Sequence, residues 1–324
     1  MYIRIRMKIS SNNIAELNTK IVKDDIMLRL GFACISKSMN ENGRFKTMSV
    51  KTFEGLEQSE RMRRLRLIAV DNLYNVSIIM LWCIESGIRL YRLSSDLIPL
   101  ATYVPDWHWW EDTDIQNMSE KIRKIVNGDR IRISMHPDQF CVLNSDKPEV
   151  VKGSFAILEH HNRLSNMVGN RILVLHVGSG TGGKQRAIER FIKSFNTLDN
   201  DIKEKIVVEN DDKIFNAEDV LSLCEHLNIP MVLDIHHHNC NHENDNLPQI
   251  IERIRNTWKG QRPKMHLSSG RSCPTDRHHS DFIDFEDYKQ AVELVKDDFD
   301  IMMECKEKDL AVLQIMDKTA EQQG

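Results

Sequence analysis

The chain has 324 residues, 41% of them hydrophobic, which suits one large globular domain. Its net charge of −4 argues against an extensive non-specific nucleic-acid surface, although not against a local one. No apolar run approaches the roughly 20 residues of a membrane span, and residues 1–24 lack the apolar core of a signal peptide, so we expect a cytoplasmic protein without a membrane partner. Seven scattered cysteines without a CxxC pair argue against a disulfide framework or a four-cysteine zinc site and favour free thiols.

Eight short β-branched or apolar runs predict eight strands along the chain. They are Met27–Phe32, Ile88–Leu93, Arg130–Met135, Ile172–Val177, Lys205–Val208, Pro230–Ile235, Pro263–Leu267 and Phe299–Met303. Segments with helical periodicity separate them, among them Gln58–Glu85, a helix capped by Asn216, and Phe285–Val295. Strand–helix alternation repeated eight times closes most simply as a (β/α)8 TIM barrel over residues 27–324, with a doubly wound open sheet as the alternative. Residues 1–26 then form an N-terminal extension.

Metal-type ligands stand at one end of six consecutive predicted strands. They are His136, His176, Glu209, Asp234 with His237, Lys264 with His266, and Glu304. In a barrel these strand ends converge on one mouth. Imidazole nitrogens and carboxylate oxygens together suit zinc, manganese or iron, and a pair of bridged cations can bind both the attacking and the leaving oxygen of a phosphodiester. One such residue alone is usually a structural polar group or a helix cap, but agreement over six strands indicates a metal site at the active-site end of the barrel.

The other histidines are weaker candidates. His160 and His161 fall in the middle of a predicted helix, and His226, His242 and His278 are expected on the surface or behind the ligands. In a strand, Asp234 and His236 share a face, so His237 reaches the site only if the chain turns after Asp234. We therefore leave His236 and His238 outside the metal site.

Two loops at the predicted mouth carry further signals. The segment from Gly178 to Lys184 has the spacing of a phosphate-binding loop, but Gln185 stands where Ser or Thr would hold magnesium, so we expect no nucleotide cofactor. The loop 96–116 contains Trp107, Trp109 and Trp110, and either packs on the core or contacts the substrate.

Ordered motifs extend over residues 27–310. They are Arg29–Phe32, Tyr91–Ser95 with Ile98-Pro99, Ser134–Phe140, Leu158–His161, His176–Gly178 with Lys184 and Arg190-Phe191, Val208–Asp212, Asp234–His238, Lys264–Ser268, His279–Phe282 and Met303-Glu304. In order and spacing these motifs resemble the UV damage endonuclease family, a metal-dependent barrel family related to the endonuclease IV group. The resemblance implies a DNA-repair endonuclease that nicks duplex DNA immediately 5′ of UV photoproducts and leaves a 3′-hydroxyl and a 5′-phosphate.

The resemblance also implies three divalent metal ions, with Mn2+ as the first expectation and Zn2+, Co2+ or Mg2+ as alternatives. The implied ligand sets are His136, His176 and Glu209; Glu209, Asp234, His266 and Glu304; and His237 with His279. Glu209, His266 and Lys264 are the implied catalytic residues. Because cations repel an ammonium group, Lys264 has to be neutral or carry a modification such as a carboxylate.

On the DNA side, Gln139 and Phe140 match the pair that probes the lesion in the family, where a Tyr often replaces the Phe. Phe32, placed on the loop after the first strand, is similar to another aromatic of that wedge, although both Phe residues could be core aromatics. Lys184 and Arg190 are expected to contact phosphates. A histidine that the family often places near the active site is replaced by Tyr103, and His108 could substitute for it only if the loop bends back. The expected partner is UV-damaged double-stranded DNA, bound by a monomer that associates with the nucleoid through DNA.

Other functions stay open at this point. A divalent-metal sugar isomerase or epimerase uses a related barrel and similar ligands, and an abasic-site endonuclease is closer still. A non-catalytic damage-binding or metal-storage protein is a third class. The pair His237 and His279 and the pair Gln139 and Phe140 favour the nuclease.

Overall fold

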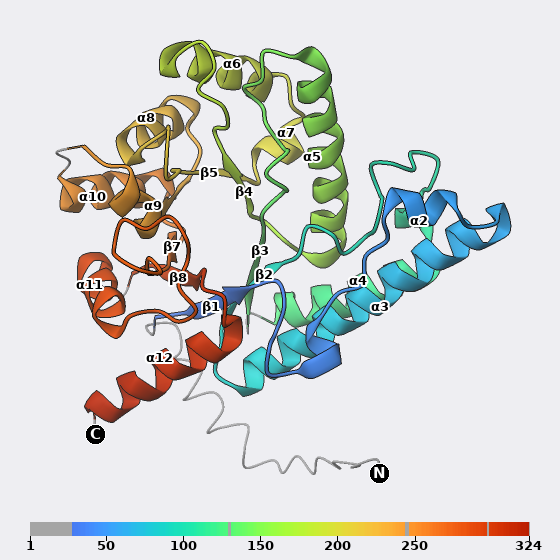
Figure 1. The fold of residues 1–324 in the computed structure, drawn as a ribbon, viewed down its shortest axis with the longest axis horizontal. Helices are drawn as coiled ribbons and strands as arrows, with labels where there is room; N and C mark the ends of the chain where they lie inside the picture. The colour runs from blue at the N-terminus through green and yellow to red at the C-terminus, as the bar shows by residue number, and fades with distance from the viewer. Residues whose placement is uncertain (1–27, 129–130, 244–245, 297, 324) are drawn as a thin grey trace.

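The computed structural model describes residues 28–128, 131–243, 246–296 and 298–323, and these residues form a closed parallel barrel of eight strands in chain order (Figure 1). The strands are β1 Leu30–Ala33, β2 Leu90–Leu93, β3 Arg132–Met135, β4 Leu173–His176, β5 Ile206–Glu209, β6 Met231–Asp234, β7 Lys264–Leu267 and β8 Asp300–Met303. The predicted (β/α)8 barrel is confirmed, and the open sheet is wrong, because β8 pairs with β1. Met27 and Arg130, where two predicted strands begin, and the expected extension 1–26 lie outside the described residues.

Helices surround the barrel (Figure 1). They are α2 Val50–Glu54, α3 Gln58–Glu85, α4 Thr113–Asn127, α5 Pro148–Val168, α6 Lys184–Asn196, α7 Asn200–Lys203, α8 Ala217–Leu227, α9 Ile235–Cys240, α10 Leu247–Thr257, α11 Phe285–Val295 and α12 Lys308–Gln323, with 3-10 turns η1 Asn40–Gly43 and η2 Trp109–Glu111. The helix start expected at Asn216 is confirmed. The Asn216 side chain accepts a hydrogen bond from the Asp219 N–H at 3.0 Å, and the Asp219 carboxylate accepts one from the Asn216 N–H at 3.0 Å. This capping box fixes the direction in which the chain leaves β5.

The interior of the barrel is polar along much of its axis. The Arg132 guanidinium on β3 donates to Asp300 on β8 at 2.7 Å, and the Lys264 ammonium on β7 donates to the Ser134 hydroxyl on β3 at 2.6 Å. Neither pair of strands is adjacent in the barrel, so both contacts cross its interior. Because side chains alternate along a strand, His266 faces inward like Lys264, while Met265 points away.

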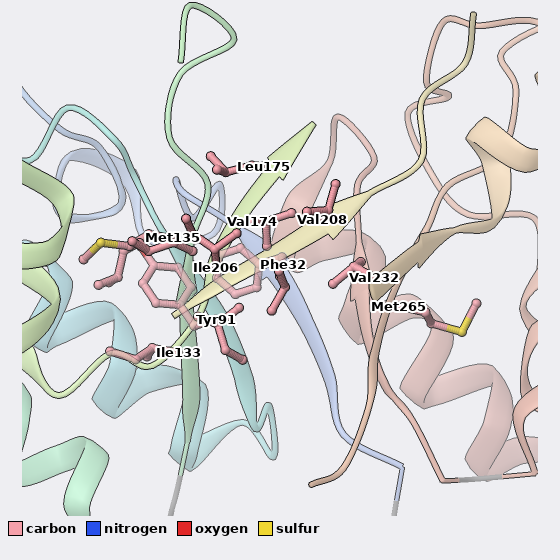
Figure 2. Packing of buried hydrophobic residues seen from close by; sticks show 14 of the residues in the cluster. Phe32, Tyr91, Ile133, Met135, Val174, Leu175, Ile206, Val208, Val232 and Met265 are labelled. Carbon is pink, nitrogen blue, oxygen red and sulfur yellow. The ribbon is translucent and has the colours of Figure 1, made fainter. Parts of the chain in front are cut away.

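Apolar side chains hold the strands to one another and to the helices (Figure 2). Phe32 belongs to this packing: it is fully buried in β1, with its ring centroid 5.3 Å from Tyr91 and 6.5 Å from Trp82 of α3. The expected position of Phe32 on a loop after the first strand is therefore wrong. A ring packed between the sheet and α3 has no surface to offer to DNA, so its place in the lesion wedge is withdrawn.

Two further expectations can be compared with the described residues. By length and composition, α3 is apolar enough to cross a membrane, so the statement that no segment approaches a membrane span is wrong by that measure. A single helix of this kind is weak evidence for a membrane span, and α3 packs against α4 beside the barrel (Figure 1).

In the tryptophan loop 96–116, Trp107 and Trp109 are buried in the core, which supports the interpretation that this loop packs on the core.

Candidate metal centre

The polar residues at the strand ends gather at one mouth of the barrel. Three groups of His, Asp and Glu side chains bring their ligand atoms within 4.8 Å of one another and could each hold a metal ion. The groups are His136, His176 and Glu209; Glu209, Asp234 and His237; and Glu209, His266 and Glu304. Parallel strands all end at the same rim, which is why residues separated by up to 168 positions in the chain meet there.

Glu209, at the end of β5, lies at the centre of the cluster and is almost fully buried. Its Oε2 is 3.3 Å from His136 Nε2 and 3.7 Å from His176 Nε2, while its Oε1 is 2.7 Å from His266 Nδ1. Two histidines on one oxygen and a third on the other give this carboxylate the geometry of a bridge.

The turn required for His237 exists. Asp234 ends β6 and caps α9, accepting a hydrogen bond from the His237 N–H at 2.8 Å. The chain therefore turns directly after Asp234, and the His237 ring returns toward the cluster, 3.7 Å from both Asp234 Oδ2 and Glu209 Oε1. His237 Nδ1 donates to the Asn210 carbonyl at 3.0 Å, which leaves Nε2 available to a ligand.

Burial and charge shift the ionisation of these groups. Burial disfavours the charged form of Glu209, but His266 and His176 outweigh it and hold the pKa of Glu209 well below its usual value. Burial also opposes protonation of His237, yet the carboxylates of Asp234, Glu209 and Glu304 raise its pKa to about 9. Against the effect of burial, the carboxylates Glu209 and Glu304 likewise raise the pKa of His266, whereas burial lowers the pKa of His136, so the cluster combines ionised carboxylates with two histidines, His237 and His266, that favour the protonated form.

Several buried polar atoms of the cluster have no hydrogen-bond partner among the described residues. They are His176 Nδ1, Glu209 Oε2, Asp234 Oδ2 and His266 Nε2. A buried polar atom without a partner costs about 1–3 kcal/mol, and divalent cations are the partners that carboxylate oxygens and imidazole nitrogens share. The donor set therefore fits bound metal ions.

Lys264 lies directly below this cluster in the barrel and is fully buried. Burial, together with the positive charges of Arg92 and Arg132, lowers the pKa of Lys264 to about 7. The amine is therefore able to lose its proton near neutral pH, as a lysine beside metal ions requires.

Arg92 on β2 is a member of the site that sequence reasoning missed. Its guanidinium forms a short ion pair with Glu304 at the end of β8, two strands away around the barrel, and Glu304 Oε1 is also 3.0 Å from His266 Nδ1. Although burial raises the pKa of a carboxyl group, Arg92 and His266 hold the pKa of Glu304 well below its usual value. The one available signal was a charged residue inside an otherwise apolar strand, Leu90–Leu93.

Comparisons with known proteins agree with this geometry. The family model described as UV-endonuclease UvdE matches residues 28–324. The chain belongs to this family. Proteins named UV DNA damage endonuclease from Bacillus cereus strain B4264 and Bacillus mycoides strain KBAB4 are both 33% identical to it, over 92% and 90% of this chain and 96% and 94% of theirs. The crystal structure of SacUVDE has a TM-score of 0.80 at 31% identity and covers 91% of this chain and 99% of that one. Endonuclease IV from Thermus thermophilus, at 15% identity and a TM-score of 0.57, shares the fold over 90% of this chain and 99% of that one.

The UvdE family motif after β3 places Gln139 and Phe140 at the surface. The Phe140 ring is 70% exposed, and its backbone N–H donates to Asp138 at 2.9 Å in a local turn. An exposed aromatic ring four residues after His136 is not part of the core, so the core interpretation of Phe140 is wrong. Its contact with a lesion remains a prediction.

The remaining candidates of the UvdE motifs have other neighbours in this structure. Lys184 begins α6 and forms an ion pair with Asp219 at 2.6 Å, while Arg190 donates to the carbonyls of Asn144 and Thr181. Arg190 thus holds two loops together. Tyr103, in the position where the family often has a histidine, donates a hydrogen bond to Glu54 at 2.6 Å.

His279 lies at the edge of the cluster. Its ring centroid is 6.3 Å from that of His237 and 5.4 Å from that of His236, which was left outside the site from the sequence. His236 is buried, and its ring packs beside that of His279.

Proposed function

We propose that the protein is a DNA-repair endonuclease that nicks duplex DNA immediately 5′ of UV photoproducts, both cyclobutane dimers and 6-4 photoproducts, and leaves a 3′-hydroxyl and a 5′-phosphate. Membership of the UvdE family, the relatives named UV DNA damage endonuclease and the likeness to SacUVDE support this activity. The observation that carries the mechanism is the buried Glu209 carboxylate shared by all three ligand groups.

The proposed metal ligands overlap the three groups at the mouth, in which Asp234 lies with Glu209 and His237, and add His279. We assign one divalent ion to His136, His176 and Glu209, a second to Glu209, Asp234, His266 and Glu304, and a third to His237 and His279, with manganese as the first candidate. Because His237 also lies 3.7 Å from Asp234 Oδ2, the second and third sets adjoin one another. Divalent ions bound there would neutralise charge on the phosphodiester and lower the pKa of the attacking water.

The chain's own residues have distinct tasks in this proposal. Glu209 supplies negative charge to both halves of the cluster, and His266 holds Glu209 and Glu304 in a fixed arrangement. Lys264, whose pKa is about 7, adds a polar group at the base of the cluster and little positive charge, either as the free amine or as a carboxylated lysine. These three residues are the catalytic candidates Glu209, His266 and Lys264.

Recognition is assigned to the rim of the mouth. Photoproducts weaken base stacking, so bending the duplex and extruding the damaged bases costs less at a lesion than elsewhere. The exposed Phe140 ring fills the resulting gap in the stack, and Gln139 hydrogen-bonds the orphaned bases opposite. Lys184 contacts a backbone phosphate once its ion pair with Asp219 is broken.

We further propose that the protein acts as a monomer without a nucleotide cofactor and associates with the DNA in the cell. Residues 27–324 form the endonuclease domain in this proposal, and residues 1–26 form an extension.

The test is incision of a duplex that carries one cyclobutane dimer, compared with undamaged and abasic duplexes, in manganese, in zinc and in chelator. Nicking of the dimer duplex alone, 5′ to the lesion and dependent on metal, is expected. Preference for the abasic duplex would replace the proposed substrate, and absence of nicking on all three duplexes in every metal would overturn the proposal.

A further inference from the structure

A hollow of about 400 Å³ opens beside the metal cluster and carries a strong positive charge. The charged residues in its wall are Arg92, Arg271, Arg277, Lys306, Lys308 and Glu304. Five cations against one carboxylate stand out in a chain whose net charge is −4. Local concentration of one sign of charge in a concave surface focuses the field and attracts an opposite charge.

The hollow is joined to the candidate metal centre by shared walls. Glu304 and His279 belong to both, and Arg92 on β2 pairs with Glu304 after β8, with only β1 between the two strands. A group bound in the hollow is therefore a direct neighbour of a group bound at the cluster. In a nucleic acid the direct neighbour of one phosphate along the backbone is the next phosphate.

The loop between β7 and α11, which supplies Arg271 and Arg277, is built to a fixed shape. Asp276 accepts hydrogen bonds from the Ser272 N–H and hydroxyl and from the His278 N–H and ring. A Cβ at Gly270 would lie 2.0 Å from the Cys273 carbonyl oxygen, so only glycine fits there. Since the loop already has its fixed shape before an anion binds, little ordering of the backbone is needed when its arginines bind one.

Backbone contacts attach the same loop to the segment that carries the lysines. The Lys306 N–H donates to the Ser280 carbonyl at 3.1 Å, and the Glu307 N–H donates to the Asp281 carbonyl at 2.9 Å. The cations of the two segments are thereby fixed relative to each other as two sides of one hollow.

The carboxylates next to these cations leave them able to bind another anion. Arg277 is 3.4 Å from Asp212, and Lys306 is 3.4 Å from Asp281, both at exposed positions. Exposed pairs of this kind contribute about 0–1 kcal/mol. Within the described residues, no carboxylate pairs with Arg271, which projects from the loop at an exposed position. A phosphate can therefore displace these contacts at small cost.

We propose that this hollow binds the DNA backbone phosphate that neighbours the scissile phosphodiester, with Arg271 and Arg277 as the principal contacts. The proposal rests on the proposed function and deepens it, since it states how the strand is positioned over the cluster. Arginine suits this task because its planar guanidinium can offer two parallel N–H donors to a phosphate.

The experiment measures binding of a short duplex with a single cyclobutane dimer to the full-length chain in chelator, so that cleavage does not interfere. Arg271→Ala combined with Arg277→Ala is expected to raise Kd about tenfold and to reduce the slope of log K against log salt by about 1–2. Arg271→Lys with Arg277→Lys should retain most of the slope. Arg171→Ala is the matched control, because Arg171 is exposed just before β4, at the opposite end of the barrel.

A second measurement locates the phosphate. In duplexes with one neutral methylphosphonate linkage, the Kd of the double alanine variant should equal that of the unmodified protein only when the neutral linkage adjoins the scissile position. An unchanged Kd and salt slope in a folded double variant would overturn the inference, as would a defect that persists at every linkage. If the double variant binds normally while the unmodified protein nicks dimer duplexes in manganese, the proposed function stands without the hollow; if the unmodified protein nicks none in any metal, the proposed function itself fails.

Discussion

His266 Nδ1 lies 2.7 Å from Glu209 Oε1, and both residues are buried at the mouth of the barrel. Glu209 comes from the end of β5 and His266 from β7, with β6 between them. The contact therefore spans one strand of the rim and draws two ligand groups toward a single carboxylate. This relationship explains why the loss of Glu209 should affect every proposed metal set at once.

Glu209→Gln removes the shared negative charge but keeps the side-chain size. We expect nicking of a dimer duplex to fall by at least about a thousandfold, because loss of metals leaves the scissile phosphate without charge neutralisation. Metal content after dialysis, measured by elemental analysis, should fall in parallel. Glu189→Gln, an exposed glutamate on α6, is the matched control and should behave as the unmodified chain. Full nicking by Glu209→Gln would contradict the bridging role.

Metal ions should also stabilise the fold, because they satisfy the unpartnered carboxylate oxygens Glu209 Oε2 and Asp234 Oδ2. A ligand that binds only the native state at a hundred times its Kd adds about 2.7 kcal/mol to the free energy of unfolding. We expect Tm to rise when manganese is added to chelator-treated protein. Asp234→Asn should reduce this rise, whereas an equal rise in that variant would argue against ion binding at Asp234.

Phe140→Ala should weaken recognition of the lesion and leave stability unchanged. The ring is 70% exposed, so its removal opens no cavity in the core. Stacking of an aromatic ring on a base contributes about 1–3 kcal/mol, and Kd for a dimer duplex should rise roughly tenfold or more, with Kd for undamaged duplex changed much less. Tyr74→Ala, which removes an exposed ring from α3, serves as control. Equal losses on both duplexes would show that Phe140 does not read damage.

Phe32→Ala should have the opposite profile. The ring packs on Tyr91 and Trp82 and is fully buried, and truncation of such a ring costs about 3–5 kcal/mol. Denaturant unfolding should show that loss, while the fraction that remains folded should bind a dimer duplex with nearly unchanged Kd. A specific loss of lesion binding without loss of stability would restore Phe32 to the recognition surface.

The difference between Phe32 and Phe140 shows where sequence reasoning reaches its limit. Both follow or fall within predicted strands, and both occupy family motifs. A strand of a parallel barrel is buried on both faces, so its residue pattern does not reveal which side chains face the helices. The gathering of the strand-end His, Asp and Glu residues was predictable for a different reason: the topology brings the carboxyl ends of all strands together, whatever the exact register.

Contacts between strands that are not neighbours in the barrel were beyond prediction. Arg92 meets Glu304, and Lys264 meets Ser134, over separations of 212 and 130 residues. Such pairs depend on the tilt and stagger of the strands, which no local pattern encodes. Consequently the residues of the cluster were named from the sequence, but the arginine that holds Glu304 ionised was not.

The pH dependence of stability should include a contribution from Asp201, far from the cluster. Its carboxylate accepts hydrogen bonds from the buried Lys205 ammonium at 2.6 Å and from the amides of Asn166 and Asn162, which lower its pKa to about 2. A depressed native pKa gives stability that is fully present above the unfolded value of about 3.9 and is lost as the pH falls toward 2. Because Asp201 is half exposed, we expect Asp201→Asn to lower the free energy of unfolding by only about 1 kcal/mol near neutral pH.

That difference between the Asp201→Asn variant and the unmodified chain should shrink between about pH 4 and pH 2, because the unmodified carboxyl group becomes protonated there and its ion pair with Lys205 is lost. Urea unfolding at a series of pH values measures it. Asp199→Asn is the control, since Asp199 precedes α7 without a side-chain capping bond. A difference that stays constant down to pH 2 would mean that the carboxylate contributes through its shape and hydrogen bonds alone, and that its charge opposite the buried Lys205 adds nothing to stability.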